Sequence, residues 1–179
     1  MNNGKGTINS FYCVREQAFT SSFPPTYRAL TEPDGLLAIG GKLDAKNLLD
    51  AYKLGIFPWY SEENPVMWWS PKVRPVIRPS EIRISKSLKK TIKRNTFHLS
   101  YDKCFKKIMQ HCSTNGERAG KSWITSTMIE AYTDLHALGH AHSVECWQNE
   151  ELCGGLYGVS LGRVFYGESM FSEQPDASK

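Results

Sequence analysis

The stretch "HSVECWQNEELCGGLYGVSLGRVFYGESMF", from His142 to Phe171, decides the fold. Three runs rich in apolar, β-branched and aromatic residues are separated by the polar turn "QNEE" and by a second turn at Gly162. This pattern is typical of antiparallel strands in a meander. Inside the middle run, Gly154 and Gly155 indicate a bulge or the close approach of another backbone. The sequence therefore predicts three consecutive antiparallel strands.

Helical patterns precede these strands. Two helices are marked by their ends: Asp44 as N-cap and Gly55 as stop for the first, Thr127 with Glu130 in capping-box spacing and Gly139 as stop for the second. A further helix is expected between them, and its buried stripe comprises Tyr101, Phe105, Ile108, Met109 and Cys112.

Helices followed by an antiparallel sheet predict the α+β class. We expect a small, basic, helical N-terminal lobe over residues 1–97 and a sheet-based C-terminal lobe over residues 98–179. The 179 residues, 40% of them hydrophobic, are enough to bury a real core.

Between the first helix and the rest, "GIFPWYSEENPVMWWSP" places Trp59, Trp68 and Trp69 among three prolines. Because proline removes a backbone donor, this run is predicted to be neither a helix nor a central strand. Two interpretations of the rings stay open. They plug a gap between layers of the core, or they form the rigid apolar wall of a binding site.

Residues 81–95, "EIRISKSLKKTIKRN", predict a short amphipathic helix. Its apolar residues recur every four positions, and the opposite face carries Lys86, Lys90 and Lys93, followed by Arg94. A solvated charged face is the ordinary explanation. However, no acidic residue at helical spacing relieves the repulsion, which favours an anionic partner, with nucleic acid the first candidate.

The N-terminal residues lack the apolar core of a signal peptide, and no apolar run approaches the roughly 18 residues that span a bilayer. The five cysteines form no Cys-x-x-Cys pair and are interpreted as reduced thiols, mostly buried. We therefore expect a cytoplasmic protein without a membrane segment.

Several kinds of active site do not fit the sequence. His136, His140 and His142 are close together, but Gly139 breaks the helix between them and no glutamate has zincin spacing, so no metal is expected. "GESMF" resembles a nucleophile elbow, yet Phe171 stands where the second glycine belongs. Neither G-x-G-x-x-G nor a P-loop is present, and no cofactor is expected.

Glu168 lies in the aromatic third strand, where an unpaired buried carboxylate would be costly. It is either a solvent-facing glutamate at the sheet edge or an acceptor that fixes a cationic amino group in an apolar pocket. The residues alone leave both readings open.

Seven motifs occur in order between about Phe23 and Lys179: "EPDGLLAIGGKL", "AYKLGIFPWY", "MWWSP", "SWIT", "LGHAHSVECW", "GGLYGV" and "GESMFS". Together they resemble the leucyl/phenylalanyl-tRNA–protein transferase family. The resemblance implies transfer of leucine or phenylalanine, and of methionine more weakly, from aminoacyl-tRNA to proteins that begin with Arg or Lys. It also implies a destabilising N-terminus on the product, in the bacterial cytoplasm, and a catalytic lobe similar to the GNAT acetyltransferase fold. We expect a monomer.

The resemblance also implies site residues. The family's FPW and WIT tryptophans border the site for the aminoacyl-adenosine end of the tRNA, and they match Trp59 and Trp123. Glu168 matches the pocket glutamate and is the candidate catalytic residue. The apolar positions that receive the aminoacyl side chain match Leu156, Phe165 and Met170. Trp68 and Trp69 are expected to pack between the lobes, so that the tryptophan run is part wall and part plug.

The family's proton-handling aspartate and glutamine lie on a later strand and match nothing up to Lys179, so the catalytic lobe is interpreted as incomplete, and slow transfer is expected. The alternative reading is a fragment that grips the tRNA acceptor end through its basic helix and transfers nothing. A third class, an acyl-CoA N-acetyltransferase, lacks the phosphate-cradling loop that it requires.

Overall fold

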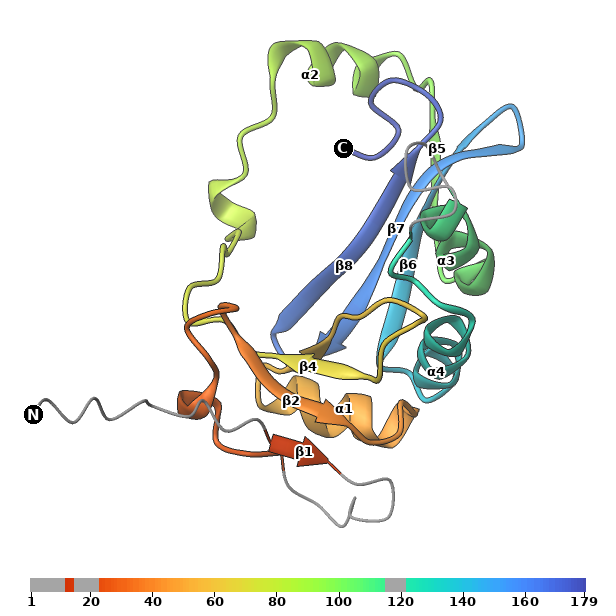
Figure 1. Ribbon diagram of the computed structural model, residues 1–179. Helices are drawn as coiled ribbons and strands as arrows, with labels where there is room; N and C mark the ends of the chain where they lie inside the picture. The colour runs from red at the N-terminus through yellow and green to blue at the C-terminus, as the bar shows by residue number, and fades with distance from the viewer. Residues whose placement is uncertain (1–11, 15–22, 115–121) are drawn as a thin grey trace, which may run out of the picture.

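The computed structural model describes residues 12–14, 23–114 and 122–179 and contains two four-stranded sheets with helices packed against them (Figure 1). The α+β class is confirmed. The second sheet is antiparallel with strands in chain order, so the predicted meander is also confirmed. Its strands are β5 (His98–Tyr101), β6 (Ala141–Gln148), β7 (Glu151–Leu161) and β8 (Val164–Ser172).

Local signals explain the two turns of the meander. Asn149 and Glu150 join β6 to β7 with φ angles of 50° and 65°, the left-handed pair that a two-residue hairpin favours. Gly162, with φ of 59°, turns β7 into β8. The sequence placed both turns correctly because each depends on neighbouring residues alone.

Helices α3 (Phe105–Thr114) and α4 (Ser126–Ala137) cover one face of this sheet (Figure 1). A Cβ atom on Gly155 would lie 2.6 Å from Cδ1 of Ile108 in α3, which is a side-chain contact. The helix lies against the strand because the strand has no side chain there. The predicted close approach of another backbone is confirmed at Gly154, where the carbonyl of Ala177 fills the place of a Cβ atom.

Two helix boundaries differ from the prediction. Tyr101 belongs to β5 and is 71% exposed, because Asp102 adopts a left-handed φ of 56° and separates the strand from α3. The N-cap of α4 is Thr125, whose Oγ1 accepts from the amide of Met128 at 3.2 Å. Thr127, predicted as the cap, lies inside the helix.

The N-terminal half contains a sheet, so the prediction of a helical lobe was wrong. Its strand order is β1-β2-β4-β3, with β1 parallel to β2 and the other pairs antiparallel. The strands are β1 (Tyr12–Val14), β2 (Leu36–Gly40), β3 (Phe57–Pro58) and β4 (Met67–Trp69). Such short strands leave little alternation for a sequence pattern to detect.

The tryptophan run was also misread, because β4 is a central strand between β2 and β3. The prolines do not interrupt it. Pro58 lies in the edge strand β3, and Pro65 and Pro71 lie outside the strands. Proline is tolerated at sheet edges and in flanking segments because no ladder donor is lost there.

Helix α1 (Ala45–Lys53) follows β2 and begins and ends as predicted. The side chain of Asp44 accepts from the amide of Asn47 at 2.9 Å, and Gly55 takes a φ of 73° just after the helix. Leu48, Ala51 and Tyr52 from α1 enter one continuous core with residues of α3, α4 and β7. The two sheets therefore share a core.

Residues 70–85 leave the first sheet, run past the open face of the second sheet, and reach α2 (Lys86–Lys93) beside the C-terminus (Figure 1). The apolar side chains of this connector are exposed, including those of Val73, Val76 and Ile77. It contains the short 3-10 helix Pro79–Glu81; another covers Thr26–Arg28. No described helix is long and apolar enough to cross a membrane.

Candidate functional site

Glu168 occupies a β-bulge in the edge strand β8. Tyr157 of β7 pairs with Ser169, and the next residue, Gly158, pairs with Gly167, so Glu168 is an extra residue without an opposite partner. A bulge changes the direction of its side chain. The carboxylate of Glu168 is thereby directed to the hydroxyls of Tyr52 in α1 and Tyr132 in α4, which hydrogen-bond to it.

The surroundings of Glu168 are a cluster of buried tyrosines. The hydroxyls of Tyr52 and Tyr132 are 2.7 Å apart, and the Tyr132 and Tyr157 rings meet edge to face at 5.9 Å. The Tyr166 hydroxyl donates to the backbone carbonyl of Tyr52 at 3.3 Å. Burial raises the pKa of Tyr52, Tyr132 and Tyr157 well above the ordinary value, so all three hydroxyls stay protonated and neutral.

Burial also raises the pKa of Glu168, from 4.5 to about 7. The hydrogen bond from Tyr52, the positive charge of Arg74 and the hydrogen bond from Tyr132 act against burial without cancelling it. Glu168 therefore exchanges a proton near neutral pH, which suits a general acid or base.

The raised pKa predicts a pH-dependent stability. The folded state holds the Glu168 proton more tightly than the unfolded chain, so stability is lost as pH rises from about 4.5 through about 7. We expect Glu168→Gln to be more stable than the parent by about 2 kcal/mol at pH 8, with most of this gain absent at pH 5. Urea unfolding at both pH values measures the difference. The exposed Glu151→Gln is the matched control, and an equal effect of the two variants would contradict the assignment.

The apolar residues predicted to receive a side chain lie on one face of the second sheet. Leu156 pairs with Met170, and Phe165 pairs with Ser160, so all three point to the face of the sheet opposite α3 and α4. Phe165 and Met170 are about half exposed. Gly158 makes room for the Phe165 ring, since a Cβ atom there would lie 2.5 Å from its Cζ.

The two predicted tryptophans are placed differently. Trp59 is 51% exposed, and its ring meets that of Trp69 edge to face at 5.4 Å. Trp123 precedes the cap of α4 and is partly buried against the core. Trp68 is fully buried, with its ring against Phe23. The plug is thus confirmed for Trp68, whereas Trp59 leaves a ring face open to solvent.

Helix α2 forms as predicted but is shorter, beginning at Lys86 after the N-cap Ser85. None of its residues is buried: Ile92 on its apolar side is exposed, and so is Ile84 just before the N-cap. Within the described part of the chain, no ion pair involves the cations Lys86, Lys90, Lys93 and Arg94. Their charge is available to an external anion.

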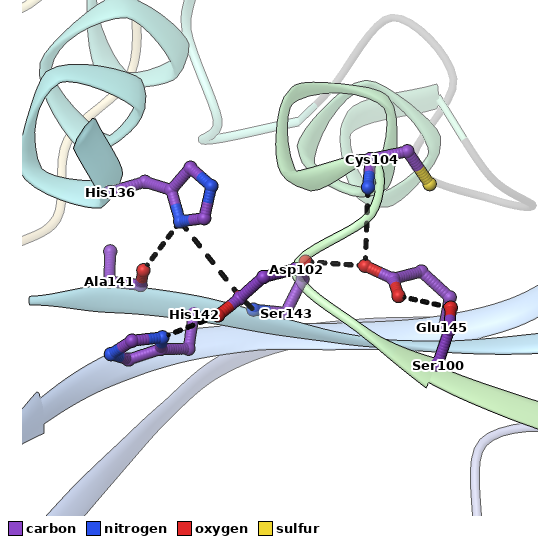
Figure 2. A network of polar contacts seen from close by, with 8 residues as sticks. All are labelled: Ser100, Asp102, Cys104, His136, Ala141, His142, Ser143 and Glu145. Carbon is purple, nitrogen blue, oxygen red and sulfur yellow. Dashed lines mark hydrogen bonds and ion pairs between the residues drawn. The ribbon is translucent and has the colours of Figure 1, made fainter. Parts of the chain in front are cut away.

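A second polar cluster was missed by the sequence analysis (Figure 2). Glu145 of β6 is fully buried and accepts from Ser100 Oγ at 2.5 Å, from Ser143 Oγ at 2.6 Å and from the amide of Cys104 at 3.4 Å. The alternation of Ser143, Glu145 and Trp147 along one strand face was the available signal. These hydrogen bonds join β5, β6 and the start of α3.

Asp102 forms the other half of this cluster (Figure 2). It accepts from the amide of Ser143 at 2.8 Å and lies 2.8 Å from Nδ1 of His142. Its partial burial would raise the pKa, but these two contacts, with the nearby His136, lower it overall. Of the three histidines considered as metal ligands, His136 and His142 thus lie near Asp102, and His136 Nδ1 also donates to the carbonyl of Ala141 at 2.7 Å.

Comparison with known proteins identifies the chain. Residues 76–179 match the family described as leucyl/phenylalanyl-tRNA protein transferase, and residues 41–72 match its N-terminal domain. A transferase of this name from Azoarcus sp. (strain BH72) is 51% identical over 158 residues, which cover 88% of this chain and 67% of the relative. Those from Hydrogenovibrio crunogenus and Legionella pneumophila (strain Lens) are both 52% identical, with 88% and 90% of this chain and 62% and 72% of the relatives covered.

These matches show that the protein is an aminoacyltransferase. It belongs to the leucyl/phenylalanyl-tRNA–protein transferase family, and the resemblance drawn from its seven motifs is confirmed. The chain spans about two thirds of the length of the relatives it matches.

Proposed function

We propose that the protein transfers leucine or phenylalanine, and methionine more weakly, from aminoacyl-tRNA to the N-terminal Arg or Lys of acceptor proteins. The product would be marked for degradation by the N-end rule in the bacterial cytoplasm. Identity of 51–52% to transferases of this name carries the proposal. The exposed lysines of α2, which form no ion pair with the residues that the structure describes, support it, because a tRNA is a polyanion.

The substrate is proposed to lie along the open face of the second sheet. Trp59 and Trp123 border the aminoacyl-adenosine end, and the exposed ring of Trp59 supports stacking on the adenine. Leu156, Phe165 and Met170 contact the aminoacyl side chain. The cations of α2, with Arg94, contact the tRNA backbone. Residues 98–179 are the GNAT-like catalytic lobe in this proposal, and residues 1–97 are the N-terminal lobe.

In the proposed reaction, the main task of the protein is to position the ester of the aminoacyl-tRNA next to the attacking amine. The α-amine of the acceptor attacks the ester carbonyl, an amide bond forms, and the ribose hydroxyl of the tRNA leaves with a proton. The ester is already activated, so no cofactor enters the proposal. The attacking amine must lose a proton, and Glu168, with a pKa of about 7, is the candidate acceptor. The enzyme is proposed to work as a monomer in solution.

Single-turnover transfer tests this function. The chain is incubated with leucyl-tRNA and a peptide that begins with Arg, and the peptide is weighed by mass spectrometry. A gain of one leucine residue supports transfer. A peptide that begins with Ser is the control for acceptor choice. Tight binding of leucyl-tRNA without any gain of mass would replace the proposal by the acceptor-end binding fragment.

Truncating either of the two tryptophans proposed to border the site, Trp59 or Trp123, should weaken substrate binding. We expect Trp59→Ala and Trp123→Ala each to reduce the affinity for a short phenylalanyl-adenosine analogue by about 5- to 100-fold, through lost stacking and apolar contact. Calorimetry measures the affinity. His140→Ala, which changes a ring outside the proposed site, should bind like the parent. Unchanged affinity in both tryptophan variants would reject the assignment.

A further inference from the structure

Helix α2 has little of its own to hold it in place. At eight residues it is shorter than the 12–15 residues or so at which isolated helices become even marginally stable. None of its residues is buried, and the connector that leads to it exposes its apolar side chains. A row of lysines can follow a stiff nucleic-acid backbone only if the helix that carries it is held in one orientation.

Thr91 of α2 forms a hydrogen bond to a distant part of the chain. Its Oγ1 donates to Oδ2 of Asp176 at 3.0 Å, across 85 residues of sequence. Among the described residues, no other side chain of α2 forms a hydrogen bond or ion pair beyond the helix and its N-cap. This bond therefore connects α2 to the C-terminal turn, beside which the helix lies in Figure 1.

The hydrogen bond of Thr91 lies on the side of α2 that faces away from the lysine stripe. With 3.6 residues per turn, Lys86, Lys90 and Lys93 form one stripe, and Thr91 lies roughly 100–160° away from each of them. Thr91 and Leu88 are the half-buried residues of α2, and the three lysines are exposed. Fixing Thr91 to the body thus turns the lysine stripe outward.

The C-terminal turn that contains Asp176 packs against the second sheet. Gly154 of β7 has no side chain, and the carbonyl of Ala177 occupies the space where a Cβ atom would be. Ala177 is buried, and the amide of Glu173 donates to the carbonyl of Cys153 at 2.8 Å. Lys179 Nζ donates to Oδ1 of Asp176 at 2.8 Å and leaves Oδ2 for Thr91.

We propose that Asp176 is a positioning residue for tRNA binding: by accepting the hydrogen bond of Thr91, it fixes α2 with its lysine stripe toward the RNA backbone. This inference rests on the proposed function of α2. By charge alone Asp176 would repel RNA, so the two effects of this side chain have opposite signs and can be separated by substitution.

The test measures binding of uncharged leucine tRNA to the full chain over a series of salt concentrations. Thr91→Val and Asp176→Ala should each lower the affinity about three- to tenfold, the effect of one lost hydrogen bond. Both should lower the slope of log affinity against log salt by about one, because fewer phosphates are reached. The double variant should bind like either single variant. Asp176→Asn keeps an acceptor oxygen and should bind near the parent level. Thr114→Val, which removes a hydroxyl at the end of α3, is the matched control.

Hydrogen exchange provides a readout that does not depend on RNA. Amides of residues 86–93 should exchange faster in Thr91→Val than in the parent, with the sheet unchanged. If the amides of residues 86–93 exchange at the parent rate, the hydrogen bond from Thr91 to Asp176 does not hold α2 in place, and the proposal is overturned. Faster exchange with unchanged tRNA affinity overturns the positioning role. If Asp176→Ala and Asp176→Asn both bind tRNA more tightly, Asp176 acts only by repelling the RNA, and this result would also overturn the positioning role. If Lys86→Glu, Lys90→Glu and Lys93→Glu combined bind tRNA normally, α2 is no RNA contact and the proposed function of the helix fails first.

Discussion

Replacing Trp68 by alanine is expected to lower the free energy of unfolding by about 3–5 kcal/mol, while Trp59→Ala changes it by less than about 1 kcal/mol. Trp68 is fully buried in the central strand β4, its Nε1 donates to the carbonyl of Gly40 at 3.0 Å, and its ring meets that of Phe23 at 4.8 Å. Removing it leaves a cavity and takes a hydrogen-bond donor from the Gly40 carbonyl. Trp59 is half exposed, so its ring leaves no cavity behind.

Urea unfolding of the two variants, followed by circular dichroism, measures this contrast. Domains of this kind are stable by only about 5–15 kcal/mol, so Trp68→Ala should be close to unfolding near body temperature. Trp68→Phe is the conservative control and should recover much of the loss, because it refills most of the cavity. Equal destabilisation by Trp59→Ala and Trp68→Ala would contradict the division of the tryptophans into a buried and an exposed role.

Reversing the lysine stripe of α2 should have the largest effect on binding. We expect the combined variant Lys86→Glu, Lys90→Glu and Lys93→Glu to bind aminoacyl-tRNA about a hundredfold more weakly at roughly 0.1 M salt. The slope of log affinity against log salt should fall by about three, one for each lost phosphate contact. Contacts to the backbone carry no sequence information, so tRNAs for leucine and phenylalanine should be affected alike.

The matched control changes the same charge elsewhere. Lys103, Lys106 and Lys107 are exposed at the start of α3 or just before it, across the sheet from the connector. Their combined change to Glu alters the net charge equally and should weaken binding only modestly. If both triple variants lose the same affinity, the effect comes from net charge and the stripe has no special role. An unchanged affinity in the α2 variant excludes the helix as a tRNA contact.

The parts of the fold that were predicted correctly depend on neighbouring residues. Asp44 and Gly55 bound α1, and the turn at Gly162 needs only a left-handed residue. Strand β4 could not be recognised, since three residues carry no periodicity and its partners lie elsewhere in the chain.

The candidate site follows the same division. Motifs identified Glu168 and Trp59 by resemblance, but nothing near Glu168 in sequence indicated its surroundings. Tyr52 lies 116 residues before it and Tyr132 lies 36 residues before it, and only the packing of α1 and α4 brings them to the carboxylate. The bulge was equally invisible, because it depends on how β8 is registered against β7. Likewise, Ser100 meets Glu145 across 45 residues.

The irregularity at Glu168 has a consequence for how β8 can change. If this one residue were deleted, Gly167 would still face Gly158 and Ser169 would still face Tyr157, and the two strands would form an uninterrupted ladder. The pairing of β7 with β8 does not need a residue at this position. A strand shortened by one residue should therefore fold with its neighbours in their present places, while Tyr52 and Tyr132 lose the Glu168 carboxylate to which both hydrogen-bond. Deleting Glu168 alone should therefore remove the buried carboxylate and keep the pairing of β7 with β8.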